Sequence, residues 1–82
     1  MNVAVDISLY PLQEDLVPPI LDVIRRLNAY DNVYVDTNSM STQIRGEYDD
    51  VMSAISAEFK TTFEQLPKAV FVMKILNNPI AD

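Results

Sequence analysis

The sequence contains no cysteine, no histidine and no tryptophan, and its 82 residues include only one glycine. Without cysteine and histidine the chain has no disulfide, no thiol nucleophile, no histidine general base and no cysteine-based zinc site. Most enzyme chemistry is therefore excluded, and we expect a protein that is not an enzyme and that carries no cofactor or metal. The lack of cysteine also fits a reducing compartment.

Positive charge is scarce, because six Lys and Arg face twelve Asp and Glu and the formal net charge is −6. This balance opposes binding to nucleic acid or to anionic lipid. The longest apolar run, residues 69–73, is far shorter than the ~20 residues of a membrane helix. The first residues lack the basic and apolar regions of a signal peptide, so we expect a cytoplasmic protein without a membrane partner.

Hydrophobic periodicity predicts four strands and two helices. In chain order, the expected elements are a strand over 3–9, a helix that starts at 15 or 17 and runs to 27, strands over 33–38 and 40–47, a helix over 49–66 and a strand over 69–76. Pro18 and Pro19 fit only the first turn of a helix, and Pro67 ends the second helix. Arg25 and Arg26 are expected on the water-facing side of the first helix.

The order β-α-β-β-α-β predicts a ferredoxin-like α+β fold over residues 1–82, a single domain with a four-stranded antiparallel sheet and both helices on one face. The last strand should lie at an edge, yet Val70, Val72 and Leu76 make its outer face apolar as well. We expect a second copy to cover this face in a dimer or tetramer. The alternative is that these side chains tolerate partial exposure.

Two segments resemble the thiamine-binding or YkoF-like family. They are Ile7-Ser8-Leu9-Tyr10-Pro11-Leu12 in the first strand and residues 38–52, which contain Met-Ser-Thr-x-Ile-x-Gly-Glu. The resemblance implies a small ferredoxin-like domain that binds thiamine or its hydroxymethylpyrimidine part without converting it, for carriage, buffering or salvage. It also implies dimers or tetramers whose sheets pack together. The competing hypothesis is a structural or regulatory oligomer without a vitamin ligand.

A thiamine site needs hydroxyl or carboxylate acceptors for the amine of the pyrimidine, apolar walls for the rings and a negative environment for the thiazolium. Together with the resemblance, this chemistry selects eight candidate ligand contacts: Asp6, Ser8, Tyr10, Asn38, Met40, Ser41, Thr42 and Glu47.

Several of these candidates also have a purely structural interpretation. Asp6 could pair with Arg45 or Lys74 on a solvated sheet face, and Tyr10 could simply pack at the end of its strand. Asn38 is a common turn former, and Glu47 could cap the second helix. Ser41 and Thr42 point to opposite faces, so we expect one of them to be structural unless the hairpin end twists.

The single glycine, Gly46, lies where a strand is expected to meet a helix. We expect it to adopt a positive φ or to allow a close approach that a side chain would obstruct.

Overall fold

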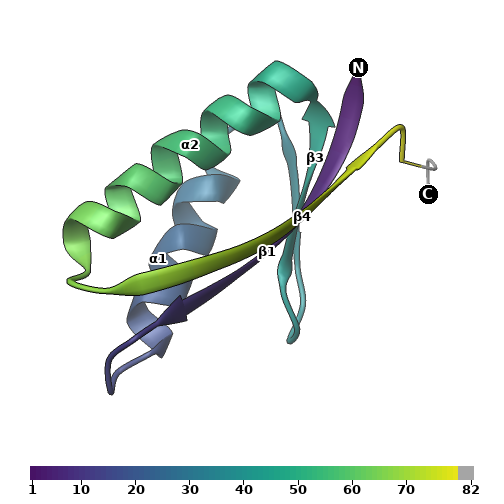
Figure 1. The fold of residues 1–82 in the computed structure, drawn as a ribbon. Helices are drawn as coiled ribbons and strands as arrows, with labels where there is room; N and C mark the ends of the chain where they lie inside the picture. The colour runs from purple at the N-terminus through teal and green to yellow at the C-terminus, as the bar shows by residue number, and fades with distance from the viewer. Residues whose placement is uncertain (80–82) are drawn as a thin grey trace.

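The computed structural model describes residues 1–79 as one antiparallel sheet with two helices on the same face (Figure 1). The elements are β1 (Asn2–Pro11), α1 (Val17–Asn28), β2 (Tyr34–Thr37), β3 (Thr42–Glu47), α2 (Tyr48–Gln65) and β4 (Ala69–Asn77). The strand order is β2-β3-β1-β4, and all three pairings are antiparallel. This is the ferredoxin-like α+β fold, and it confirms the predicted element order with β1 and β3 at the centre.

The hydrophobic core lies between the sheet and the two helices. Side chains alternate between the two faces of a strand, so every second residue of β1 points toward the helices. Along a helix, residues three or four apart lie on the same side, and this side of each helix packs against the sheet. The buried cluster consists of Val3, Val5, Ile7, Val23, Leu27, Ile44, Val51 and Ile55. On the opposite face of the sheet, no helix of residues 1–79 covers the side chains.

The surface of α1 differs from the expected pattern. Leu21 is 57% exposed although it is apolar, whereas Val23 and Leu27 are buried. Arg26 was expected to face water, but its Nε donates to Oε1 of Glu58 and its Nη2 donates to Oγ1 of Thr62 at 3.0 Å. The prediction for Arg26 was therefore wrong, because α2 lies beside α1 and supplies a buried carboxylate that the pattern of α1 alone does not reveal.

The connection between β2 and β3 spans residues 38–41 and is longer than expected, because β2 ends at Thr37 and β3 begins at Thr42 and not at Met40. Asn38 holds this loop: its Oδ1 accepts from the N–H of Met40 at 2.8 Å and from the N–H of Ser41 at 3.1 Å. Its own N–H donates to the carbonyl of Ser41 at 3.1 Å. The loop thus leaves the sheet two residues early, which exposes one side of β1.

Gly46 meets both structural expectations. Its φ is +157°, and a Cβ at this position would lie 3.3 Å from Cγ2 of Val51 and 3.5 Å from the carbonyl oxygen of Asn32. The close approach lets α2 start directly after β3 and bury Val51 under the sheet. Among residues 1–79, neither helix has the length and apolar character needed to cross a membrane.

Candidate ligand-binding groove

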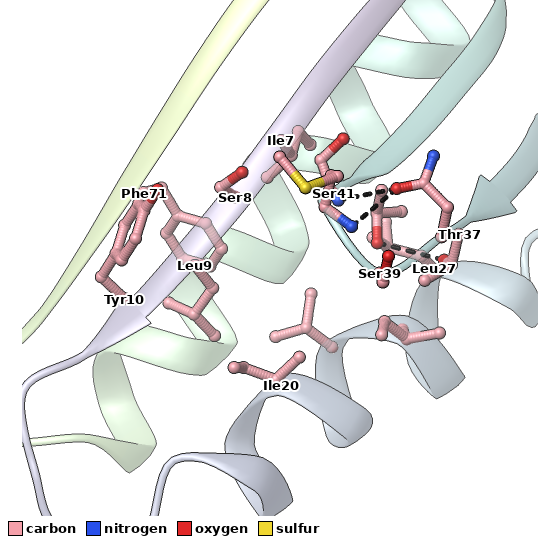
Figure 2. A pocket seen from close by; sticks show the side chains of 15 residues that line it. Ile7, Ser8, Leu9, Tyr10, Ile20, Leu27, Thr37, Ser39, Ser41 and Phe71 are labelled. Atoms are coloured by element: carbon pink, nitrogen blue, oxygen red, sulfur yellow. Dashed lines mark hydrogen bonds between the residues drawn. The ribbon is translucent and has the colours of Figure 1, made fainter.

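A groove of about 190 Å³ lies at the end of the sheet where β1 runs past β3. The last pair between these strands is Ile7 with Thr42, and residues 8–11 pair only with β4. α1 lies along one side of the groove and the loop of residues 38–41 along the other, as Figure 2 shows. The groove therefore exists because β1 is longer than its neighbour β3.

The groove combines apolar walls with a polar rim. The walls are formed by Ile7, Leu9, Ile20, Val23, Ile24, Leu27 and Phe71. The other lining residues are Ser8, Tyr10, Thr37, Asn38, Ser39, Met40, Ser41 and Thr42. All of these side chains are uncharged, so the groove can hold a neutral ring but contains no counter-ion for a cation.

Six of the eight predicted site residues line this groove. They are Ser8, Tyr10, Asn38, Met40, Ser41 and Thr42. Met40 is 85% exposed and Tyr10 is 54% exposed, whereas Thr42 is buried. The Oγ1 atoms of Thr37 and Thr42 lie 3.1 Å apart and share a hydrogen bond. Ser41 and Thr42 both reach the groove because Ser41 belongs to the loop and not to the flat part of the strand.

Asp6 lies elsewhere, in the middle of the sheet face opposite the two helices, between Gln43 and Lys74. Its Oδ2 is 3.8 Å from Nζ of Lys74, and its Oδ1 is buried without a hydrogen-bond partner. Together with Gln43 and Arg45 it lines a separate hollow of about 230 Å³. The contact with Lys74 is one of the two ion pairs that the sequence offered as an alternative to ligand binding.

Glu47 is also outside the groove, at the first turn of α2. Its Oε2 accepts from the N–H of Asp49 at 2.9 Å and from the N–H of Asp50 at 3.4 Å. The extended backbone of Glu47, with φ −69° and ψ 142°, is typical of a residue that caps a helix. The structure therefore gives Glu47 the capping contacts that were the alternative interpretation of this residue.

The main chain of Leu9 contributes a feature that the sequence did not indicate. Leu12 N–H donates to the carbonyl of Lys68, and Asn78 N–H donates to the carbonyl of Asn2, so even-numbered residues of β1 turn their main chain toward β4. Because this direction alternates along a strand, Leu9 turns both its N–H and its C=O toward the groove. Past Ile7, no strand among residues 1–79 pairs with that side of β1.

Most residues of the apolar wall were not predicted from the sequence. Ile20 and Ile24 come from α1 and Phe71 comes from β4, and both elements are distant in sequence from the hairpin. In the sequence these residues are recognisable only as members of apolar stripes, and an apolar stripe does not indicate whether a residue lines a groove or lies in the core. Among the described residues, no group of three or more His, Cys, Asp or Glu side chains is placed to hold a metal ion.

The chain thus has a ferredoxin-like fold with a groove lined by uncharged side chains at one end of its sheet. The model of the YkoF-related family matches residues 2–79, and the chain belongs to that family. This match confirms the resemblance that the two sequence segments indicated. No curated protein matches the sequence.

Solved structures share the fold at low sequence identity. The hypothetical protein MJ1052 of Methanocaldococcus jannascii is 23% identical with a TM-score of 0.82, over 99% of this chain and 84% of the other. TM0486 of Thermotoga maritima, described as a candidate thiamine biosynthesis/salvage protein, is 19% identical with a TM-score of 0.82, over 92% and 82%. SP2199 of Streptococcus pneumoniae is 19% identical with a TM-score of 0.77, over 98% and 90%.

Proposed function

We propose that this protein binds hydroxymethylpyrimidine, or thiamine through its pyrimidine ring, without converting it. The observation that carries the proposal is the groove between α1, β1 and the loop of residues 38–41, with apolar walls and a rim of hydroxyl and amide groups. Its volume of about 190 Å³ is below the ~300–1,000 Å³ of typical small-molecule pockets and therefore suits a single small ring.

The main chain of Leu9 offers the donor and acceptor that an aminopyrimidine edge requires. The exocyclic amine would donate to the carbonyl of Leu9, and the adjacent ring nitrogen would accept from its N–H. Burying such polar groups is favourable only when both are hydrogen-bonded. The hydroxyl of Ser41 lies on the same groove and could bond the hydroxymethyl substituent.

The thiazolium ring of thiamine would lie toward the mouth of the groove, where Tyr10 and Met40 are exposed. A cation over the face of Tyr10 gains ~0.5–2 kcal/mol. No Lys or Arg lines the groove, so a diphosphate would gain no ion pair there. We therefore propose that the neutral pyrimidine and unphosphorylated thiamine are preferred over thiamine diphosphate.

Family membership and one structural neighbour support a thiamine-related role. The chain belongs to the YkoF-related family, and TM0486 is described as a candidate thiamine biosynthesis/salvage protein. We propose that residues 1–82 act as a single binding domain for cytoplasmic carriage, buffering or salvage of the vitamin. The proposed ligand contacts are Ser8, Tyr10, Asn38, Met40, Ser41 and Thr42, with the main chain of Leu9 added.

A second candidate function is an assembly module whose sheet face serves only protein contacts. On the face without helices, Val70, Val72 and Leu76 are 44%, 52% and 57% exposed. Such a cluster of apolar side chains favours packing against another sheet. We propose that this face associates with a second copy, and this association is compatible with ligand binding because the groove opens at the end of the sheet.

Calorimetric titration with hydroxymethylpyrimidine, thiamine and thiamine diphosphate tests the ligand. We expect saturable binding of the first two. Ser41→Ala should weaken binding about fivefold if its hydroxyl bonds the ligand, which corresponds to ~1 kcal/mol. Ser56→Ala, at an exposed position on α2, is the matched control.

Asp6→Asn and Glu47→Ala test the two predicted contacts that lie outside the groove. Unchanged affinity would remove both from the site, whereas a loss of thiamine affinity in Asp6→Asn alone would move the site to the hollow beside Lys74. A flat response to all three ligands from a folded protein would favour the assembly module instead.

A further inference from the structure

The polar side chains that line the groove carry no charge. A carboxylate only accepts hydrogen bonds and an ammonium or guanidinium group only donates them, whereas a hydroxyl does both. Among residues 1–79, no Asp, Glu, Lys or Arg lines the groove, and its polar side chains are hydroxyls and one amide. Asp6 and Glu47, the two acidic residues predicted as ligand contacts, lie outside it. None of the lining side chains is therefore the charged acceptor that would favour an amine over a carbonyl.

The one amide in the lining, that of Asn38, uses its acceptor within its own loop. Its Oδ1 accepts from the N–H of Met40 at 2.8 Å and from the N–H of Ser41 at 3.1 Å. An amide oxygen has two lone pairs, so these contacts occupy both. The remaining polar group of this side chain is its NH₂, which donates and therefore suits a ligand carbonyl.

Thr37 and Thr42 form a hydroxyl pair in the groove (Figure 2). Their Oγ1 atoms are 3.1 Å apart, and either atom can be the donor. Whichever hydroxyl donates, the other keeps its hydrogen, so the pair can bond either a carbonyl or an amine. Thr42 is only 8% exposed, and a buried polar group that loses its partner costs free energy. The pair avoids this cost with either kind of ligand.

The main chain of Leu9 fits two kinds of ring edge. Its N–H and C=O both face the groove, as in a residue that exchanges two hydrogen bonds with a partner strand. A lactam edge has an N–H beside a C=O, so it would donate to the carbonyl of Leu9 and accept from its N–H. An aminopyrimidine edge meets the same two groups after the ring is turned over. Leu9 alone therefore does not separate the two kinds of ring.

We propose that the groove, because no carboxylate of residues 1–79 lines it, also binds neutral oxopyrimidines through their lactam edge, with affinities within about tenfold of that for hydroxymethylpyrimidine. This inference rests on the groove and the Leu9 contacts of the proposed function, but it does not need an amine on the ligand. Both kinds of ligand are planar single rings of similar size, so the same apolar walls fit both. A site with a fixed acceptor for the amine would separate them by a much larger factor, because a carbonyl would leave that acceptor unpaired.

Charge limits this ligand class to neutral rings. No Lys or Arg of residues 1–79 lines the groove, and the chain carries a net charge of −6. An anionic ring would lose its hydration in the groove without gaining an ion pair. Orotate has the lactam ring of uracil and an added carboxylate, so it should bind at least about tenfold more weakly than uracil.

Calorimetric titration of the wild-type protein with hydroxymethylpyrimidine, its 4-oxo analogue, uracil and orotate tests the proposal. We expect saturable binding of the first three, with the 4-oxo analogue within about tenfold of hydroxymethylpyrimidine. Binding of hydroxymethylpyrimidine with a 4-oxo analogue weaker than this would overturn the inference and leave the proposed function intact.

The other outcomes of this titration are equally distinct. Binding of the 4-oxo analogue and uracil without hydroxymethylpyrimidine would support the lactam contact and overturn the proposed function. A folded protein that binds none of the four ligands would overturn both. Orotate that binds as tightly as uracil would show that the uncharged lining does not govern the contact, and would overturn the inference.

Two carboxylate variants test whether the lack of a fixed acceptor is the cause. Ser39→Asp and Ser41→Asp each add a carboxylate to the loop beside Met40, and Ser39→Asn and Ser41→Asn are the uncharged controls of nearly the same shape. A carboxylate that reaches the ligand accepts the second hydrogen of the amine, which the 4-oxo analogue lacks. We expect at least one Asp variant to raise the ratio of amino to oxo affinity about tenfold or more, and both Asn variants to keep the wild-type ratio. An unchanged ratio in both Asp variants, with a retained circular dichroism spectrum, would overturn the proposal.

Discussion

Tyr30 makes the free energy of unfolding depend on pH in the alkaline range. Its hydroxyl donates to Oε2 of Glu58 at 2.9 Å, and this hydrogen bond, with burial and the negative charge of Glu58, raises the pKa of Tyr30 above its usual value of 10.0. The folded state therefore holds this proton more tightly than the unfolded state. The stabilisation is fully present below about pH 10 and is lost as the pH rises through the raised pKa.

We expect the free energy of unfolding to fall as the pH rises above about 10, and to fall less in Tyr30→Phe, because that variant lacks the titrating hydroxyl. Urea denaturation at a series of pH values measures the effect. Tyr34→Phe, at a position that is 65% exposed, is the control and should keep the wild-type slope. Equal slopes in wild type and Tyr30→Phe would show that the contact with Glu58 does not contribute.

Individual residues were predictable where the constraint is local in sequence. The structural interpretations of Gly46 and of Asn38 as a turn former are confirmed, because a strand-to-helix junction and a tight loop each favour one residue type. The contact between Arg26 and Glu58 was not predictable, because the two residues are 32 positions apart in the sequence and lie on different helices. Only the packing of α1 against α2 brings them into contact.

At the scale of elements, the first turn of α2 depends on Glu47. Its carboxylate accepts from the N–H groups of Asp49 and Asp50, which have no partner within the helix. We expect Glu47→Ala to lower the free energy of unfolding by ~1 kcal/mol, as for other helix caps, while ligand affinity stays unchanged. Urea denaturation and calorimetry on the same preparation measure the two effects.

Glu47→Asp is the matched variant for this test, because a shorter carboxylate can still cap a helix and should recover most of the stability. If Glu47→Ala instead lost ligand affinity at full stability, Glu47 would be a binding residue and the groove would be incomplete without it.

The order and type of all six elements were predictable because each has a clear period and flanking proline or turn residues. The start of β3 was not, since Met40 continues the alternation whereas the hydrogen bonds of Asn38 hold Met40 and Ser41 in a loop. That two-residue difference opens the groove, so the site residues on the hairpin could be named from the sequence but the shape of the site could not. Ile20, Ile24 and Phe71 join it only through the fold.

At the scale of the whole molecule, net charge and local charge act differently on a cationic ligand. The chain carries −6, but the groove is lined only by uncharged side chains. Thiamine in the groove would be attracted by the distributed field of the protein and not by a contacting carboxylate. Salt screens such long-range attraction, with a Debye length of ~10 Å at 0.1 M ionic strength.

We expect the affinity for thiamine to fall only about two- to threefold between about 0.05 M and about 0.5 M salt. Hydroxymethylpyrimidine, which lacks the thiazolium charge, is the control ligand, and its affinity should not change. Calorimetry at both salt concentrations, with the mass in solution checked, measures this. A loss of tenfold or more for thiamine alone would indicate a carboxylate in direct contact with the cation, because a close ion pair contributes more Coulomb energy than a distributed field. Asp6 would then be the first residue to test, since it is the one predicted acidic contact that faces a hollow.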